Sequence, residues 1–342
     1  MASLNVLVTA ASRRVPLVAA FQRAVHDLPQ GGRVIVTDIN PLSPAVRVAD
    51  RAYRVPLAGD TGYVDALLDI CVAERIGLLV PTIDDELPLM AGARPVFEAH
   101  GVQVAVSPRT TAEVCNDKRA TCAHLRRHGV SAVRTWRPDE LPSPAPFPLF
   151  VKPRTGRGGV GAYAARTARE LEFFCDYVDD PVVQDLLDGP EYTIDVLCDF
   201  EGRPLSVVPR QRAVIRAGVM DRGRTVADPR LIDLGIACAR ALPFRGAVNL
   251  QCRMRDGRPH VFEINARFSG GIPLTIAAGA PFPRMLVDLA LGRPVAPSLG
   301  LFTDGLWLTS YESSFYVPDE EVRDALAPVP SGLAHARLGD AA

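Results

Sequence analysis

Short apolar runs alternate with helical patterns through residues 1–107, and this rhythm constrains the fold more than any other feature. The runs have the length of strands buried on both faces, and each precedes a stretch with the spacing of an amphipathic helix. Such an order favours parallel strands joined by helical crossovers. We therefore predict an α/β, doubly wound parallel sheet, with strands at 6–9, 34–37, 78–81 and 102–106 and helices at 15–25, 63–74 and 86–100.

The remaining chain has room for more than one further unit, because 342 residues exceed two domains of roughly 150 residues each. We predict a Rossmann-like domain over 1–110 and two α+β subdomains, a lid over 111–187 and a C-terminal one over 188–342. Their expected strands are 149–152, 162–165, 181–186, 191–199, 204–216, 246–254 and 259–267. Their expected helices are 111–128, 167–178, 229–241 and 274–291.

Charge is almost balanced, with 38 Lys and Arg against 39 Asp and Glu. This balance disfavours a nucleic-acid partner. No apolar run approaches the roughly 20 residues that span a bilayer, and the start of the chain lacks a signal peptide's charged head and cleavage site. The seven dispersed cysteines contain no C-x-x-C pair and are expected to be reduced thiols. We predict a cytoplasmic protein without a nucleic-acid or membrane partner.

The N-terminal region shows little sign of a dinucleotide cofactor. Residues 9–14, after the first strand, contain no glycine, although Rossmann dinucleotide sites carry their glycine fingerprint there. Asp38 ends the second strand, where a ribose-binding acid would lie, but a lone Asp at such a position is more often a turn former. We therefore do not predict an NAD-type site in this region.

A glycine-rich segment follows the strand at 149–152. Gly156, Gly158 and Gly161 match the dinucleotide expression G-x-G-x-x-G, but the next residues have a strand pattern and the helix begins only at Thr167. The segment is therefore predicted to be a hairpin tip. Such a tip can fold over phosphates and offer backbone N–H groups, and Lys152 upstream can supply a cation. A mobile hairpin with an incidental lysine remains the alternative.

Polar residues alternate with apolar ones near residue 265. Glu263, Asn265 and Arg267 project from one face of a strand because strand side chains alternate. In the preceding strand, Asn249 and Gln251 likewise share a face, and a turn at 256–257 would bring Gln251 beside Glu263. Three oxygen donors in this arrangement suit Mg²⁺ bound together with substrate phosphates. The alternative is a solvent-facing polar sheet surface.

These motifs, in this order, resemble those of the ATP-grasp ligases, and in particular proteins similar to the large subunit of carbamoyl-phosphate synthase. The resemblance covers nearly the whole chain. It implies a pre-ATP-grasp domain followed by the ATP-grasp fold, with ATP and one or two Mg²⁺ ions as cofactors, for which Mn²⁺ can substitute. Residues 116–118 and 150–153 match its two lysine motifs, and residues 155–161 match its phosphate-covering loop.

The resemblance also assigns roles to single residues. Lys118, Lys152 and the glycines Gly156, Gly158, Gly159 and Gly161 would contact ATP phosphates. The adenine would lie at Gln184 and Leu187, and Glu191 would hold the ribose hydroxyls. The metal ligands would be Gln251, Glu263 and Asn265, and Arg267 would assist phosphoryl transfer as the catalytic residue.

Two positions depart from the family pattern. The adenine strand usually offers Glu where this chain has Gln184, and Gly218 is followed by Val219 where the family has Glu. The second departure lies nearer the second substrate, so the acceptor is expected to be unusual. Two candidate acceptor sites follow from the sequence. The arginines at 210, 212 and 216 share a strand face by alternation and could bind an anion, with Arg210 and Arg212 as the candidate ligands. Gly270 and Gly271 precede a helix that starts near residue 274, and its N-terminus is the second candidate anion site.

The sequence therefore predicts an ATP-dependent carboxylate–amine ligase that forms an amide through an acyl phosphate and releases ADP and phosphate. Its partners would be small-molecule acids and amines, which the resemblance implies to be amino acids. Whether two copies form a homodimer is left open. Two alternatives remain: an ATP-grasp enzyme with a bicarbonate or kinase-like acceptor, and a nucleotide-binding regulatory protein without turnover.

Overall fold

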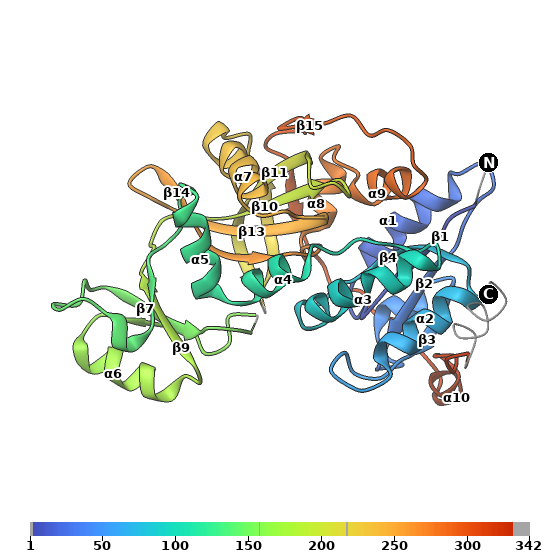
Figure 1. The fold of residues 1–342 in the computed structure, drawn as a ribbon, viewed down its shortest axis with the longest axis horizontal. Helices are drawn as coiled ribbons and strands as arrows, with labels where there is room; N and C mark the ends of the chain where they lie inside the picture. The colour runs from blue at the N-terminus through green and yellow to red at the C-terminus, as the bar shows by residue number, and fades with distance from the viewer. Residues whose placement is uncertain (1–2, 157, 217, 331–342) are drawn as a thin grey trace.

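The computed structural model describes residues 3–330 apart from 157 and 217, and its strands form three sheets (Figure 1). The N-terminal sheet is parallel, with strand order β3-β2-β1-β4-β5. Its strands are β1 (Asn5–Val8), β2 (Val34–Asp38), β3 (Arg51–Arg54), β4 (Ile76–Val80) and β5 (Gln103–Val104). The predicted doubly wound sheet is confirmed, although β3 was not expected. The segment 331–342 of the predicted third region lies outside this description.

Helices cover both faces of this sheet because its strands are apolar on both faces. Val6 and Val8 pack with α1 (Val15–His26), whereas Leu7 between them packs with α2 (Tyr63–Ala73) and α3 (Leu87–Ala99). This alternation explains the uninterrupted apolar runs. Two 3₁₀ turns complete the region, η1 (Pro44–Arg47) and η2 (Asp84–Glu86).

A four-stranded sheet, ordered β6-β9-β7-β8, follows in the chain. Its elements are β6 (Thr135–Trp136), η3 (Pro138–Glu140), β7 (Leu149–Pro153), β8 (Tyr163–Ala165), α6 (Ala168–Tyr177) and β9 (Pro181–Asp185). The capping box at Thr167 starts α6 as predicted. The single helix predicted over 111–128 is wrong: Asp117 is extended and caps Ala120, which separates α4 (Arg109–Asn116) from α5 (Lys118–Arg127).

The largest sheet has seven strands, ordered β14-β13-β10-β11-β12-β16, with β15 beside β11. Its strands are β10 (Glu191–Cys198), β11 (Pro204–Arg216), β12 (Val219–Thr225), β13 (Gly246–Arg255), β14 (Arg258–Asn265), β15 (Ser298–Leu299) and β16 (Trp307–Thr309). Helix α7 (Pro229–Ala241) was predicted. The helix predicted over 274–291 is instead broken into α8 (Ile272–Ala277) and α9 (Phe282–Ala290), because Gly279 takes a positive φ and Pro281 follows it.

The three sheets differ in how they share a core. Figure 1 shows the N-terminal sheet at one end, the four-stranded sheet with α6 at the other and the seven-stranded sheet between them. Two large apolar clusters each join side chains from the N-terminal and seven-stranded sheets, whereas the four-stranded sheet encloses a small cluster of its own. The four-stranded sheet is therefore less tightly tied to the rest.

The chain returns to the N-terminal sheet near its end. After α10 (Asp319–Arg323), Ala327 forms a parallel bridge with Tyr53 at the outer edge of β3. The N–H of Arg54 donates to the Ala327 carbonyl, and the N–H of Ala327 donates to the carbonyl of Ala52. None of the helices in the described residues is long and apolar enough to span a membrane.

Candidate active site

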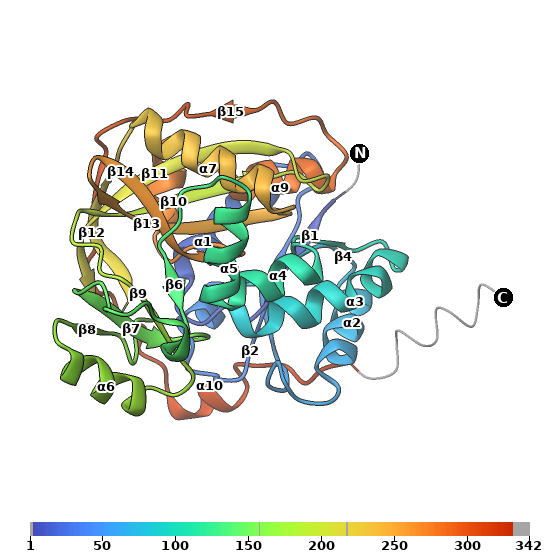
Figure 2. The ribbon, with the colours of Figure 1, turned by 60° about the vertical axis from the view of Figure 1, so that its left-hand side comes forward.

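A cavity of about 370 Å³ is lined by residues of the four-stranded and seven-stranded sheets, which face each other in Figure 2. This volume is typical of small-molecule sites. Many of the residues singled out in the sequence line it, and they come from β7, β9, β10, β11, β13, β14 and their loops: Lys152, Gly158, Gly159, Gln184, Leu187, Glu191, Arg212, Gln251 and Glu263. The fold therefore gathers residues spread over more than 100 positions of the chain.

The hairpin of β13 and β14 supplies the oxygen donors. Gln251 lies directly opposite Glu263, and Asn249 lies opposite Asn265, as the alternation predicted. The strands turn at 256–257, where both residues have positive φ. The side-chain amide nitrogen of Asn265 donates to Oε1 of Glu263 over 3.3 Å. This contact links two candidate metal ligands on one face of the hairpin.

Two lysines supply positive charge around the cavity. Lys152 is buried, its Nζ donates to the Phe262 carbonyl over 3.3 Å, and burial lowers the pKa of Lys152 to about 8. Glu263 is the largest opposing influence on this pKa. Lys118, at the start of α5, does not line the cavity but donates through Nζ to the Gly156 carbonyl over 2.7 Å. A buried cation without a carboxylate in hydrogen-bond contact is costly unless an anion is bound.

Gln184 is held in one orientation at the edge of the cavity. The hydroxyl of Thr135 donates to the Val133 carbonyl at 3.4 Å, so it presents a lone pair to the Gln184 amide nitrogen, which donates to it over 2.9 Å. The same nitrogen contacts the sulfur of Cys122 at 3.7 Å. Among the described residues the Gln184 carbonyl oxygen has no hydrogen-bond donor, although the side chain is 2% exposed. An acceptor is thus left for a ligand in the cavity.

Glu191 is bound by two arginines. Arg212 donates to its Oε1 over 2.5 Å and Arg253 donates to its Oε2 over 2.6 Å. Burial lowers the pKa of Arg212, and the Glu191 carboxylate opposes that shift. Each carboxylate oxygen retains a second lone pair, so Glu191 can still accept from a hydroxyl. Arg212, which the sequence offered as an acceptor ligand, lines this cavity.

Two loops approach each other over the cavity. Gly158 belongs to the loop between β7 and β8, and Gly218 to the turn between β11 and β12. A Cβ atom added to Gly218 would lie 3.0 Å from the Cα of Gly158, and both residues have positive φ. Side chains would prevent this approach. Gly156 and Gly161 belong to the same loop without lining the cavity, and Arg157 lies outside the described residues.

The other predicted acceptor residues, Arg210, Gly270 and Gly271, do not line the cavity. Arg210 is 1% exposed and makes two hydrogen bonds of 2.9 Å to Asp195, while its Nη2 also donates to the Ser269 hydroxyl. A Cβ on Gly271 would lie 2.2 Å from Arg210 Nη1, so glycine there makes room for the arginine. A Cβ on Gly270 would likewise lie 3.0 Å from a methyl carbon of Val219. These glycines therefore have a packing role.

Two further acceptor expectations are corrected by local geometry. The helix after 271 has only six residues, so it provides a weak dipole for an anion. The predicted common face of three arginines ends at Arg212, because the pairing of β11 with β12 shifts register on both sides of Val214. Arg216 is consequently exposed and pairs with Glu312 at 2.8 Å.

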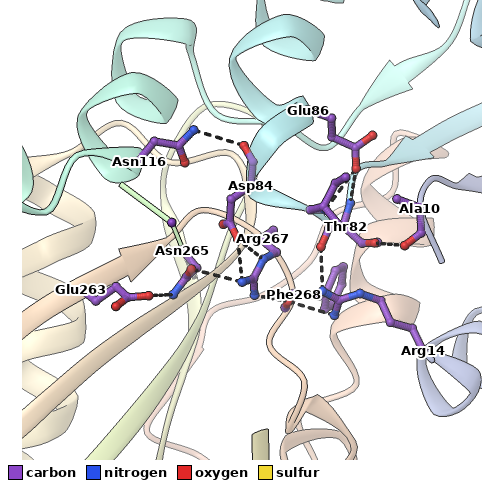
Figure 3. Close-up of polar contacts among 12 residues, drawn as sticks. Ala10, Arg14, Thr82, Asp84, Glu86, Asn116, Glu263, Asn265, Arg267 and Phe268 are labelled. Carbon is purple, nitrogen blue, oxygen red and sulfur yellow. Dashed lines mark hydrogen bonds and ion pairs between the residues drawn. The ribbon is translucent and has the colours of Figure 1, made fainter. Parts of the chain in front are cut away.

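Arg267 contacts the N-terminal domain (Figure 3). Its Nε and Nη2 both donate to Oδ2 of Asp84, at 3.1 and 2.8 Å, and Nη2 also donates to the Asn265 side-chain oxygen at 3.1 Å. Arg267 does not line the cavity but is joined to it through Asn265 and Glu263. No sequence motif indicated the Asp84 contact.

The donor set fits a hard cation that shares its ligands with phosphates. It contains one carboxylate and two amides, and among the described residues no cluster of three Asp, Glu, His or Cys side chains could hold a metal alone. Mg²⁺ commonly takes one or two carboxylates, with phosphate and water oxygens completing its shell. Asn265 would have to turn its oxygen from Arg267 toward the ion.

Two segments of this chain match known protein families. Residues 178–307 match the family described as ATP-grasp in the biosynthetic pathway with Ter operon, and residues 6–105 match the PylC-like N-terminal domain. The chain therefore contains a PylC-like N-terminal domain followed by an ATP-grasp domain. This confirms the resemblance seen in the sequence.

Other known proteins are more distantly similar. The arginine-specific large chain of carbamoyl phosphate synthase from Halalkalibacterium halodurans is 24% identical over 291 residues, which are 78% of this chain and 27% of that protein. This chain thus spans about a quarter of that relative. One solved structure with a similar fold is the biotin carboxylase domain of Hydrogenobacter thermophilus 2-oxoglutarate carboxylase, in complex with MgADP and bicarbonate. Its TM-score is 0.69 at 17% identity, and the matched region is 90% of this chain and 74% of that chain.

A second solved structure shares the fold. The L-amino acid ligase from Bacillus licheniformis has a TM-score of 0.65 at 21% identity and covers 86% of this chain and 77% of its own. At these identities the solved structures show a common fold only. Among them are proteins that act on different small molecules, so the reaction of this chain must be inferred from its own site.

Sequence reasoning missed several residues that contact the predicted site residues. Thr135 and Asp84 had no motif, and their partners lie 49 and 183 positions away. Arg253 and Asp195 carried a weak signal, since each is a charged residue in a strand that alternates polar and apolar positions. Asp84 also offered one, because acids that follow a parallel strand lie at the ligand-binding edge of the sheet.

Proposed function

We propose that this chain is an ATP-dependent carboxylate–amine ligase. The observation that carries the proposal is the cavity in which the buried Lys152 ammonium faces the oxygen donors Gln251 and Glu263. A buried ammonium favours a bound anion, and the oxygen row favours the cation that accompanies it. A nucleoside triphosphate with Mg²⁺ supplies both. The free carbonyl oxygen of Gln184 fits the 6-amino group of adenine.

The chain's residues would act in phosphoryl transfer as follows. Lys152 and Lys118 bind the phosphates, and Gln251, Glu263 and Asn265 would hold Mg²⁺, whose charge offsets that of the phosphates. Arg267 stabilises charge on the transferred group. A substrate carboxylate oxygen attacks the γ-phosphorus and ADP leaves, which gives an acyl phosphate.

The second step forms the amide. An amine nitrogen attacks the acyl carbon, the C–O bond to phosphate breaks, and the nitrogen loses a proton. The loops that carry Gly158 and Gly218 cover the cavity, and their closure would keep water from the acyl phosphate. The amino acid ligase among the structural neighbours supports this acceptor class.

Trapping the intermediate tests the proposal. The purified chain is incubated with MgATP, a panel of amino acids and hydroxylamine, and ADP and hydroxamates are measured. We expect hydroxamate with at least one acid, and an amide by mass spectrometry when an amine replaces hydroxylamine. ADP release that depends on bicarbonate, without hydroxamate, would favour the carboxylase-like alternative, and nucleotide binding without ADP release would favour the regulatory one.

We also propose the division 1–110, 111–187 and 188–342 and the remaining site roles. The three sheets, which occupy residues 5–104, 135–185 and 191–309, support this division. Limited proteolysis would test it, with cuts expected near 107–117 and 186–190. The Hydrogenobacter neighbour is a domain dimer. A homodimer of this chain is a separate proposal, which analytical ultracentrifugation would test.

A further inference from the structure

We propose that Asp84 of the N-terminal domain is a positioning residue that fixes Arg267 for phosphoryl transfer, which rests on the proposed function. Arg267 follows β14 and reaches across to η2, the turn after β4 (Figure 3). Its side chain is 13% exposed and that of Asp84 is 15% exposed, so the ion pair is largely shielded from water. Shielding strengthens the pair relative to a surface ion pair.

The orientation of the Arg267 guanidinium is fixed by several hydrogen bonds. Nε and Nη2 donate to Asp84, Nη2 also donates to Asn265, and Nη1 donates to the Phe268 carbonyl over 3.0 Å. A guanidinium has five N–H groups, and these contacts use four of them. One N–H of Nη1 therefore has no partner among the described residues, and it is available to an oxygen of the transferred group.

Asp84 itself stands on a rigid support. The Glu86 carboxylate, two residues later, is fully buried and accepts four hydrogen bonds of 2.6–3.1 Å, from the Thr9 and Tyr63 hydroxyls and the N–H groups of Thr82 and Ile83. The Asn116 side chain donates to the Asp84 carbonyl over 3.1 Å, and Asn116 ends the helix before Lys118. The turn is thus anchored on both sides.

This arrangement links the N-terminal sheet to the reacting end of the cavity. When Asn265 turns its oxygen toward a metal, Arg267 loses its hydrogen bond to Asn265 but keeps its two hydrogen bonds to Asp84. The arginine is then still oriented without rebuilding its environment, which is the advantage of a preorganised charge. The N-terminal domain therefore contributes to the transfer step through Asp84 and not only as a scaffold.

Asp84→Asn tests this role because it removes the charge with little change in shape. We expect kcat for MgATP hydrolysis without an acid to fall about 10- to 100-fold, while the ATP KM changes less than about twofold, since Arg267 does not line the cavity. Asp84→Glu should recover several-fold of the lost rate because it restores the carboxylate. In Arg267→Lys, adding Asp84→Asn should cause little further loss.

Asp38→Asn is the matched control. Asp38 is also an aspartate, ends β2 at the same edge of the sheet, and accepts from the N–H groups of Ser12 and Asn40 without touching Arg267. It should lower the melting temperature while leaving kcat within about twofold. An Asp84→Asn rate equal to that of the control would overturn the proposal.

The readout separates this proposal from the ligase proposal. Hydrolysis needs only transfer of phosphate to water, so the Asp84 test does not require a known acid. A wild-type protein that hydrolyses ATP but yields no hydroxamate would contradict the ligase proposal and leave the Asp84 result interpretable. A wild-type protein that releases no ADP from MgATP, either alone or with the panel of acids, would contradict both.

Discussion

The candidate-site cavity and the Arg210 network are built on the same three strands, yet their polar groups are used differently. Strands β10, β11 and β13 provide Glu191, Arg212 and Gln251 to the cavity, and they provide Asp195, Arg210 and Asn249 to the network. In the network the charged groups are bonded to other side chains, whereas in the cavity Lys152 and Gln184 can still form hydrogen bonds. Residue type alone therefore does not identify a ligand-binding residue. A polar group that lines a cavity and lacks a full set of hydrogen bonds is a better indicator.

The largest effect should follow from removing a cavity carboxylate. Glu263→Ala should lower the rate of ADP release about 100-fold or more, because it removes the only carboxylate of the candidate metal ligands. The melting temperature should change little. Glu201→Ala, which removes a surface carboxylate, is the control. If Glu263→Ala keeps more than about a tenth of the wild-type rate at saturating Mg²⁺, the metal assignment is wrong.

Breaking the Arg210 network should instead affect folding. Arg210→Met leaves the Asp195 carboxylate buried without its cation, so we expect a loss of about 3–5 kcal/mol in the free energy of unfolding, measured with urea. Arg216→Met, in an exposed pair, should cost less than about 1 kcal/mol. A stable Arg210→Met protein with a raised acceptor KM would return Arg210 to the substrate site.

Lys152 should give the cavity a pH dependence. Burial lowers the pKa of Lys152 to about 8, so the ammonium is present below this pH and is lost as pH rises through it. We expect kcat/KM for ATP to fall by up to tenfold per pH unit above about 8. Lys152→Arg should flatten this limb because arginine stays charged. An unchanged profile in that variant would exclude Lys152 as its source.

The smallest effect should come from the support of Gln184. Thr135→Val removes the hydroxyl that fixes the amide, so the carbonyl oxygen no longer faces the cavity in every molecule. We expect the ratio of kcat/KM for ATP over GTP to fall about 3- to 10-fold, the value of one hydrogen bond. Thr135→Ser keeps the hydroxyl and should keep the ratio. Equal ratios in all three proteins would show that Gln184 does not select the base.

Local signals predicted much of the fold. The apolar runs gave the parallel sheet, Thr167 gave the start of α6, and the polar alternation placed Gln251 opposite Glu263. These features depend on a few neighbouring residues. The errors in helices occurred where one or two residues stop a helix within an otherwise continuous pattern, as Asp117 does between α4 and α5.

Contacts distant in sequence were not predictable in this way. The Arg267–Asp84 pair spans 183 positions and the Arg210–Ser269 contact spans 59, and neither leaves a periodic signal. Burial also determined which arginines could meet a ligand. A strand pattern shows that Arg210 and Arg212 share a face, but it does not show that Asp195 already holds one of them.

The return of the chain to β3 has a consequence for self-association. A strand at the edge of a sheet offers unpaired N–H and C=O groups to any passing strand, including that of another copy. Ala327 occupies part of this edge by pairing with Ala52 and Arg54. The segment around Ala327 thus covers part of an edge at which another copy could otherwise pair and aggregate. It also ties this part of the chain to the N-terminal domain, and a truncation before residue 327 would remove that contact.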